Sequence, residues 1–173
     1  MYLLFCAAYM GVLFILQLLV GNVGVYLPLC ALGVFYLSVS GSWRKAVFVA
    51  LLAGAALDSL YGRSLMLSPF TFVLTALYGQ FWIRHYNSKQ LAESIVPGVL
   101  IPVITLVPLW LYRFYSSGLN LFQIKSALTM FIFTCTFGAV FMPLLVIILD
   151  NAAGMFRLPK YTEAKKRLLE NRR

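Results

Sequence analysis

The sequence predicts an all-α integral membrane protein, built as a bundle of six transmembrane helices, and two observations carry this prediction. Of the 173 residues, 62% are hydrophobic and only 11% are charged, whereas a soluble domain has about 25% charged residues. Apolar runs also recur along nearly the whole chain, each close to the roughly 20 residues that cross a bilayer as a helix. We therefore expect one transmembrane domain, residues 1–155, followed by a basic cytoplasmic tail, residues 156–173.

The six spans are expected where the apolar runs lie, at residues 2–20, 23–40, 45–61, 66–84, 94–112 and 126–149. The first run starts without charged residues and contains no convincing signal-peptide cleavage site, so we expect it to remain as a permanent span. Only Gly21 and Asn22 separate the first two runs. A bent hairpin at that point leaves five spans, which is the alternative count.

Prolines fall inside several of the expected spans. Pro28 and Pro69 lie near the starts of the second and fourth spans, where the missing N–H costs little. Pro102 and Pro108 lie deeper in the fifth span, where each frees a backbone carbonyl and is expected to bend the helix. We expect these bends to shape the bundle, and a concave docking groove between bent helices is the alternative.

Lysine and arginine residues indicate how the spans are oriented, because basic residues near span ends collect on the cytoplasmic side of a membrane. With a cytoplasmic N-terminus, most basic residues fall in cytoplasmic segments, and the tail contributes the largest group. The sequence therefore predicts that both termini are cytoplasmic. Aromatic residues near the ends of the fourth and fifth spans are expected in interfacial belts, namely Trp82, Tyr86, Trp110, Tyr112 and Tyr115.

The tail accounts for most of the formal net charge of +9. Its basic residues are expected to lie on anionic lipid headgroups, which attract each of them by about 1 kcal/mol near the surface. Thr162 is expected to cap a short helix that begins at Glu163. A docking site for a cytoplasmic protein is the alternative, and no motif indicates nucleic-acid binding. The residues assigned to the membrane surface are Lys160, Lys165, Lys166, Arg167, Arg172 and Arg173.

A row of small residues runs along the third span and contains an aspartate. Residues four apart share one side of a helix, and the members of this row are Ala46, Ala50, Gly54, Asp58 and Gly62. Small residues let membrane helices approach closely, which matters because lipid supplies no hydrophobic drive for helix association. We expect the row to pack against a neighbouring helix of the bundle or against a partner protein.

Asp58 is the unusual member of the row, because a carboxylate costs about 2.5–3.5 kcal/mol at the centre of a span on insertion scales. It lies near the outer end of the span, where the cost is smaller. We expect it to stay charged beside Arg63 or to accept hydrogen bonds from Ser59, Ser64 or a neighbouring helix. The alternatives are a structural latch or partner contact, and a proton- or ion-carrying acid.

Nothing in the sequence indicates an enzyme. His85 falls in a basic cytoplasmic loop, where we expect a solvated side chain. Glu93 and Asp150 are expected at the cytoplasmic boundary near basic residues, so Asp58 has no second deep carboxylate with which to form a proton relay. No Ser/His/Asp constellation, glycine-rich phosphate loop or metal-binding spacing is visible. We expect no catalytic activity, no cofactor and no metal.

The stretch from Gly54 to Leu65, GAALDSLYGRSL, resembles the signature of the rod-shape-determining MreD family. In that family a G-x-x-x-D-x-x-x-G pattern closes one span and leads into the next, along which a tyrosine follows, matched here by Tyr78. The run that starts at Pro28 is also similar to the second span of the family. One departure is Met66, which stands where the family tends to place a second glycine.

This resemblance implies a six-helix bundle similar in fold to the substrate-binding subunits of energy-coupling-factor transporters. It implies a non-enzymatic scaffold or regulator of the bacterial cell-elongation complex, which builds lateral peptidoglycan and maintains rod shape. The implied location is the bacterial cytoplasmic (inner) membrane. The implied partners are an MreC-like bitopic protein, RodA and its transpeptidase, MreB indirectly, and membrane lipids.

A substrate-binding membrane subunit of an energy-coupling-factor type transporter is the alternative function, because the two architectures are alike. Such a subunit uses a row of small residues on its first span to meet the coupling subunit, and Ala7 and Gly11 form a loose version of that row. The expected outer loops are short and poor in polar side chains, apart from the segment RFYSSGLNLFQIK. That composition argues against a pocket for a polar vitamin.

Overall fold

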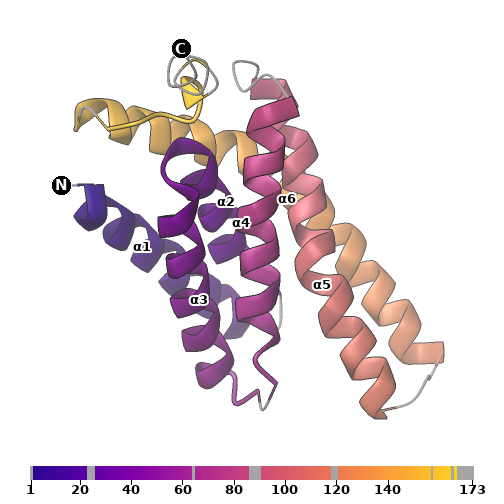
Figure 1. Cartoon of the computed structure of the whole chain (residues 1–173). Helices are drawn as coiled ribbons and strands as arrows, with labels where there is room; N and C mark the ends of the chain where they lie inside the picture. Colours follow the sequence, from indigo (N-terminus) through magenta and orange to yellow (C-terminus); the bar gives the residue numbers. More distant parts are fainter. Residues whose placement is uncertain are drawn as a thin grey trace.

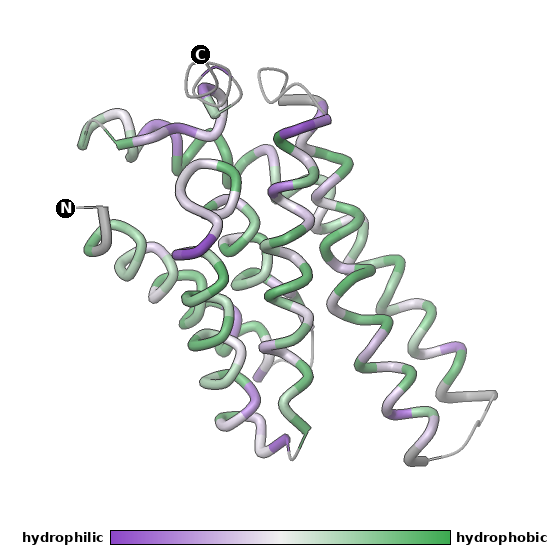
Figure 2. Tube along the Cα trace, viewed as in Figure 1, coloured by the Kyte–Doolittle hydropathy of each residue, from purple (hydrophilic) through white to green (hydrophobic). Residues whose placement is uncertain are grey.

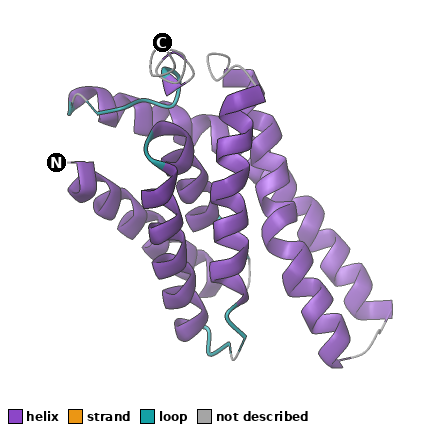
Figure 3. Cartoon of the chain, in the orientation of Figure 1, coloured by secondary structure: helices purple, strands orange, loops and turns teal. Residues whose placement is uncertain are grey.

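The computed structural model describes residues 2–22, 26–63, 65–85, 91–117, 121–156, 158–164 and 166, and this part of the chain is helical with short connecting loops (Figure 3). The expectation of an all-α protein is therefore confirmed. The helices are α1 (Tyr2–Asn22), α2 (Leu29–Ser40), α3 (Trp43–Leu60), α4 (Leu67–His85), the 3₁₀ turn η1 (Leu91–Ser94), α5 (Ile95–Ser117) and α6 (Leu121–Met155).

Within the described part of the chain, three helices are long and apolar enough to cross a membrane, over Leu4–Asn22 in α1, Ile95–Tyr115 in α5 and Ile124–Met155 in α6. Large apolar side chains cover the outward faces of the helices, as Phe48, Leu111 and Ile148 illustrate with exposed fractions of 63%, 64% and 64%. Apolar segments fill the middle of the molecule, and hydrophilic residues gather toward the helix ends (Figure 2). The chain is thus a helical membrane protein, and the count of six spans stays a prediction.

Helix α2 is the central helix of the bundle, because all of its residues are buried. It begins at Leu29, so the expected span 23–40 is wrong at its start: residues 26–28 are not helical, and residues 23–25 lie outside the described part of the chain. Pro28 therefore precedes the helix and accepts its first hydrogen bond, from the N–H of Leu32 (3.1 Å). At 1.5 Å per residue, 12 residues extend about 18 Å, well short of the ~30 Å hydrocarbon core.

Helices α5 and α6 pack along each other at a crossing of two glycines. A Cβ atom built on Gly98 would collide with the carbonyl oxygen of Gly138, and one built on Gly138 would collide with that of Gly98. Pro102 lies at the same crossing, since its Cγ atom is 3.0 Å from a Cβ atom built on Gly138.

The two ends of the bundle differ in how tightly the helices pack. Helices α2, α3 and α4 run side by side, whereas the α5–α6 pair diverges from α4 toward the end that carries the α3–α4 turn (Figure 1). The start of α1 and the tail segment 158–164 lie toward the opposite end, and the last part of α6 runs across that end (Figure 1). The helix axes are consequently further apart at the end near the turn than at the opposite end (Figure 1).

Candidate functional site at the junction of α3 and α4

The small-residue row of α3 is buried inside the bundle. Its buried members are Ala46, Ala50, Gly54 and Asp58. A Cβ atom built on Gly54 would collide with the backbone nitrogen of Pro69 and lie 2.5 Å from its Cα. The half of the row that contains Gly54 therefore packs directly against α4, and the row is an internal surface.

Asp58 is 1% exposed and binds the first turn of α4. Its Oδ2 atom accepts a hydrogen bond from the backbone N–H of Ser68 (2.8 Å), and its Oδ1 atom accepts one from the Ser68 hydroxyl (2.5 Å). The first N–H groups of a helix have no partner inside the helix, and the positive end of the helix dipole lies there. Asp58 thus caps α4 from the end of the preceding helix.

Arg63 stands beside this pair at longer range. Its Nη1 atom lies 3.5 Å from Asp58 Oδ1 and 3.4 Å from the Ser68 hydroxyl, longer than the ~2.7–2.9 Å of a strong charge-assisted hydrogen bond. The guanidinium also lies over the rings of Tyr61 (5.1 Å) and Tyr26 (5.8 Å). The hydrogen bonds from Ser68 are therefore the tighter interactions of Asp58, and Arg63 adds charge compensation.

Of the donors expected for Asp58, the structure describes Ser59 and the neighbouring helix. The Ser59 hydroxyl donates to the carbonyl of Ala55 within its own helix (2.8 Å). Ser64 lies outside the described residues. The donor is instead Ser68, a residue of the neighbouring helix.

Gly62 is not part of the buried row, so its expected place there is wrong. Helix α3 ends at Leu60, and Gly62 is exposed in the following turn with a φ of 61°. An L-residue other than glycine pays about 1–2 kcal/mol for this left-handed conformation. Gly62 therefore contributes to the junction by turning the backbone toward α4.

A second buried carboxylate, Asp150, lies near the other end of the bundle. It is 8% exposed on α6, and its Oδ1 atom accepts hydrogen bonds from the Tyr36 hydroxyl (2.7 Å) and the backbone N–H of Tyr161 (2.8 Å). Its Oδ2 atom accepts hydrogen bonds from the N–H (3.1 Å) and the hydroxyl (2.8 Å) of Thr162. Lys160 lines the same surface pocket as Asp150, in agreement with the expectation of a basic residue nearby, but the direct donors to the carboxylate are all neutral.

The start of the tail is thereby fixed to the bundle. Tyr161 is 1% exposed, its ring stacks on that of Tyr36 (6.2 Å between centroids), and its hydroxyl accepts a hydrogen bond from Trp82 Nε1 (3.1 Å). Burial raises the pKa of the Tyr161 phenol, which therefore stays neutral. Trp82 is itself 1% exposed, so its expected place in an interfacial belt is wrong. We call Asp150, Tyr36, Trp82, Tyr161 and Thr162 the tail clasp.

The tail clasp also changes the interpretation of the basic tail. Tyr161 and Ala164 belong to the hydrophobic core, and the Thr162 hydroxyl, expected as a helix cap, donates to Asp150 instead. Lys160 lies 3.9 Å from Glu163 at the surface, and Lys166 is exposed. The other members of the expected membrane-surface group lie outside the described residues: Lys165, Arg167, Arg172 and Arg173.

A pocket of about 400 Å³ opens beside the α3–α4 turn, where α5 and α6 diverge from α4. It lies next to the Asp58 junction and shares Arg63 with it. Its lining consists of Tyr26, Gly62, Arg63, Leu65, Leu67, Leu106, Leu109, Trp110, Tyr112, Arg113 and Met130. Asp58 is not among these residues, so the carboxylate serves the helix junction and not the pocket.

Together these contacts fix α4 at both ends, through Ser68 at its start and Trp82 near its finish. Among the described residues, no group of three or more His, Cys, Asp or Glu side chains is arranged to hold a metal ion. Comparisons with protein-family models, with curated proteins and with solved structures find no match for this chain. Interpretation of its function therefore depends on its own residues and geometry.

Proposed function

We propose that this chain is a non-enzymatic membrane scaffold of the bacterial cell-elongation complex, of the MreD type, with six spans in the inner membrane. The observation that carries the proposal is the geometry of the stretch that resembles the family signature. Gly54 permits the close approach of α3 to α4, Asp58 caps α4, and Gly62 makes the turn between them. Each signature position thus has a structural task, as a scaffold requires.

The surroundings of the carboxylates support a structural role over transport or catalysis. Both oxygens of Asp58 and both oxygens of Asp150 accept hydrogen bonds from the protein itself. A carboxylate that carries protons or ions must exchange these partners for its cargo during every cycle, at a cost of about 1–3 kcal/mol for each buried group left unpaired. Because every carboxylate oxygen of Asp58 and Asp150 has a partner within the protein, both side chains suit a structural role that connects helices.

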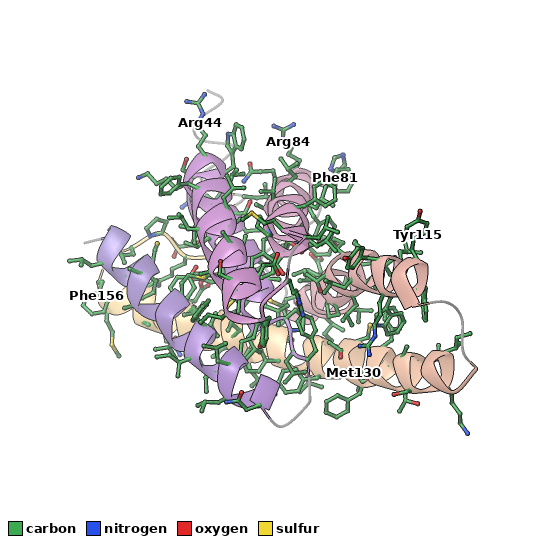
Figure 4. All side chains as sticks on the ribbon, turned by 90° about the horizontal axis from the view of Figure 1, so that it is seen from below. Arg44, Phe81, Arg84, Tyr115, Met130 and Phe156 are labelled. Carbon is green, nitrogen blue, oxygen red and sulfur yellow. The ribbon has the colours of Figure 1, made fainter. Side chains whose placement is uncertain are left out.

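The distribution of charge and of chain ends supports an even number of spans with both termini on the cytoplasmic side. The start of α1 and the tail segment 158–164 lie toward the same end of the bundle (Figure 1). Arg44 and Arg84, near the start of α3 and the end of α4, project away from the helices (Figure 4). We assign this end to the cytoplasm by the positive-inside rule.

The surface that we assign to an MreC-like bitopic partner is the outer side of α1. The groove on α3 is filled by α4, so a partner helix must use another face. Ala7 is exposed, and a Cβ built on Gly11 meets nothing within 4 Å. Leu4 and Val12 are exposed on the same helix, at 76% and 57%. RodA, its transpeptidase and MreB would join through this partner.

The test is co-purification of the tagged full-length protein in mild detergent, with identification of what travels with it and a reciprocal purification through the partner. We expect an MreC-like bitopic protein, and we expect Gly11→Leu to release it. The matched control is Ala56→Leu, at an exposed position on α3. Retention of the partner by Gly11→Leu contradicts the α1 surface, and recovery of no MreC-like protein contradicts the scaffold.

The second candidate, a substrate-binding subunit of an energy-coupling-factor transporter, is favoured by the 400 Å³ pocket and by the exposed Ala7–Gly11 row on α1. That pocket is large enough for a small ligand. Its walls, however, are mainly leucine and aromatic side chains, with two arginines as the charged groups. Co-purification of a coupling subunit with ATPases would favour this candidate.

A further inference from the structure

The pocket beside the α3–α4 turn combines a charged rim with an apolar wall. Arg63 and Arg113 both contribute to its lining, and no Asp or Glu does so among the described residues. The apolar wall consists of Leu65, Leu67, Leu106, Leu109 and Met130. Aromatic rings of Tyr26, Trp110 and Tyr112 complete the lining. A ligand that matches this surface has a negative head and an apolar body.

Arg63 is positioned by the helix junction and keeps donors for a ligand. Its hydrogen bonds to Asp58 and Ser68 both use Nη1, at 3.5 and 3.4 Å. The Nε and Nη2 groups are not used in those two bonds. Because the guanidinium also lies over two tyrosine rings, its plane is held in place before a ligand arrives. An arginine that is held in place and has two donor groups outside those bonds suits the bidentate recognition of a phosphate.

The depth of the pocket in the bundle matches the boundary of a membrane. Arg113 lies two residues before Tyr115, where the apolar stretch of α5 ends. Tyr115 is 93% exposed and points outward from the helices (Figure 4). Leu109 and Leu106 lie about one and two helical turns before Arg113, further into the apolar stretch. The arginines therefore stand at headgroup level, and the leucines stand at the level of acyl chains.

We propose that this pocket binds an anionic phospholipid, with its phosphate between Arg63 and Arg113 and an acyl chain along Leu106, Leu109 and Met130. Basic pockets between membrane helices on the cytoplasmic side hold lipid headgroups, and the two arginines offer the same chemistry at the opposite end of this bundle. Leu65 and Tyr112 line the pocket and are 47% and 39% exposed. The pocket therefore reaches the outer surface of the bundle, where lipid is available to occupy it. This lipid site is independent of the scaffold proposal, because it requires no particular protein partner.

The test uses the full chain in detergent and native mass spectrometry, with phosphatidylglycerol as the anionic probe and phosphatidylcholine as the neutral one. We expect phosphatidylglycerol to remain bound at collision energies that remove phosphatidylcholine. Arg113→Gln is expected to weaken phosphatidylglycerol binding roughly fivefold, the size of one basic contact at a membrane surface. Lys125→Gln is the matched control, because Lys125 is exposed near the start of α6 and does not line the pocket.

A second variant tests the apolar wall without altering a charge. Met130→Trp fills part of the cavity and is expected to weaken phosphatidylglycerol binding while the melting temperature in lipid-free detergent stays unchanged. Equal binding of the two lipids would overturn the proposal, as would equal losses from Arg113→Gln and Lys125→Gln. Full displacement of phosphatidylglycerol by millimolar inorganic phosphate would also overturn it, because the site would then recognise a free anion.

Discussion

Asp58 and Ser68 are joined by a pair of hydrogen bonds, in which the backbone N–H and the hydroxyl of Ser68 each donate to a different carboxylate oxygen. The pair connects the end of α3 to the start of α4 across a turn. Both residues are almost completely buried, with exposed fractions of 1% and 2%. A buried polar group must have partners, and here each residue is the partner of the other.

Two replacements of Asp58 distinguish the contribution of its hydrogen bonds to stability from the contribution of its charge. Asp58→Asn keeps an oxygen acceptor for the Ser68 N–H, and its amide can donate to the Ser68 hydroxyl, so we expect a loss of about 1 kcal/mol. Asp58→Leu leaves both Ser68 groups unpaired and is expected to cost about 3 kcal/mol. Thermal unfolding of the detergent-solubilised variants measures both. Equal losses would show that charge and Arg63 matter more than the Ser68 contacts.

Gly54 and Gly11 make a matched pair for testing the packing of the small-residue row. Gly54→Ala places a methyl group against the backbone of Pro69, which cannot move aside as a flexible side chain can, and is expected to cost about 1–3 kcal/mol. Gly11→Ala enters open space and is expected to be neutral or to stabilise α1 by up to about 1 kcal/mol. Melting temperatures of the two variants give the comparison. An unchanged melting temperature for Gly54→Ala would mean that α3 and α4 lie further apart than the contact of Gly54 with Pro69 implies.

Gly62 is expected to tolerate only residues that accept a left-handed backbone. Gly62→Ala should cost about 1–2 kcal/mol, because its φ is 61°. Gly62→Asn should cost less, since asparagine adopts this conformation more readily. Space does not limit either change, as a Cβ there meets nothing within 4 Å. Equal stability of the alanine variant and the parent would argue against this turn geometry.

Release of the tail clasp is expected when Asp150 loses its acceptor oxygens. Asp150→Asn replaces one carboxylate oxygen by an NH₂ group that faces donors, so that part of the clasp is lost. We expect faster trypsin cleavage after Lys160, measured as the rate of loss of intact protein. Glu163→Gln is the control, because Glu163 is 58% exposed and lies outside the clasp. Equal cleavage rates for Asp150→Asn and the parent would contradict the clasp.

Spacing along the chain was enough to predict the members of the buried row, but not their partner. The four-residue period and the small side chains identify one side of α3. The donor to Asp58 depends on how the turn after Leu60 brings Ser68 back, and that path follows from the left-handed backbone of Gly62. The same backbone explains why Gly62 leaves the row.

The tail clasp could not be predicted because its members are far apart in the sequence. Tyr36 and Asp150 are separated by 114 positions, and the charged residues around Tyr161 make the tail resemble a purely surface segment. One available signal was Tyr161 itself, an aromatic residue directly after Pro159 and Lys160 in the basic tail. The sequence contained a clearer signal for the start of α2. The residue before a proline is disfavoured in helices, so Pro28 indicates a helix that begins no earlier than the proline itself.

A double-mutant cycle on Asp58 and Ser68 tests most directly the claim that Asp58 joins α3 to α4. Ser68→Ala removes the hydroxyl donor, and we expect it to lower the melting temperature of the parent by roughly 2–4 °C, equivalent to about 1 kcal/mol for a chain of this size. In the Asp58→Leu background the same change should leave the melting temperature unchanged or raise it, because the buried hydroxyl has already lost its acceptor. Equal shifts in the two backgrounds would contradict the junction.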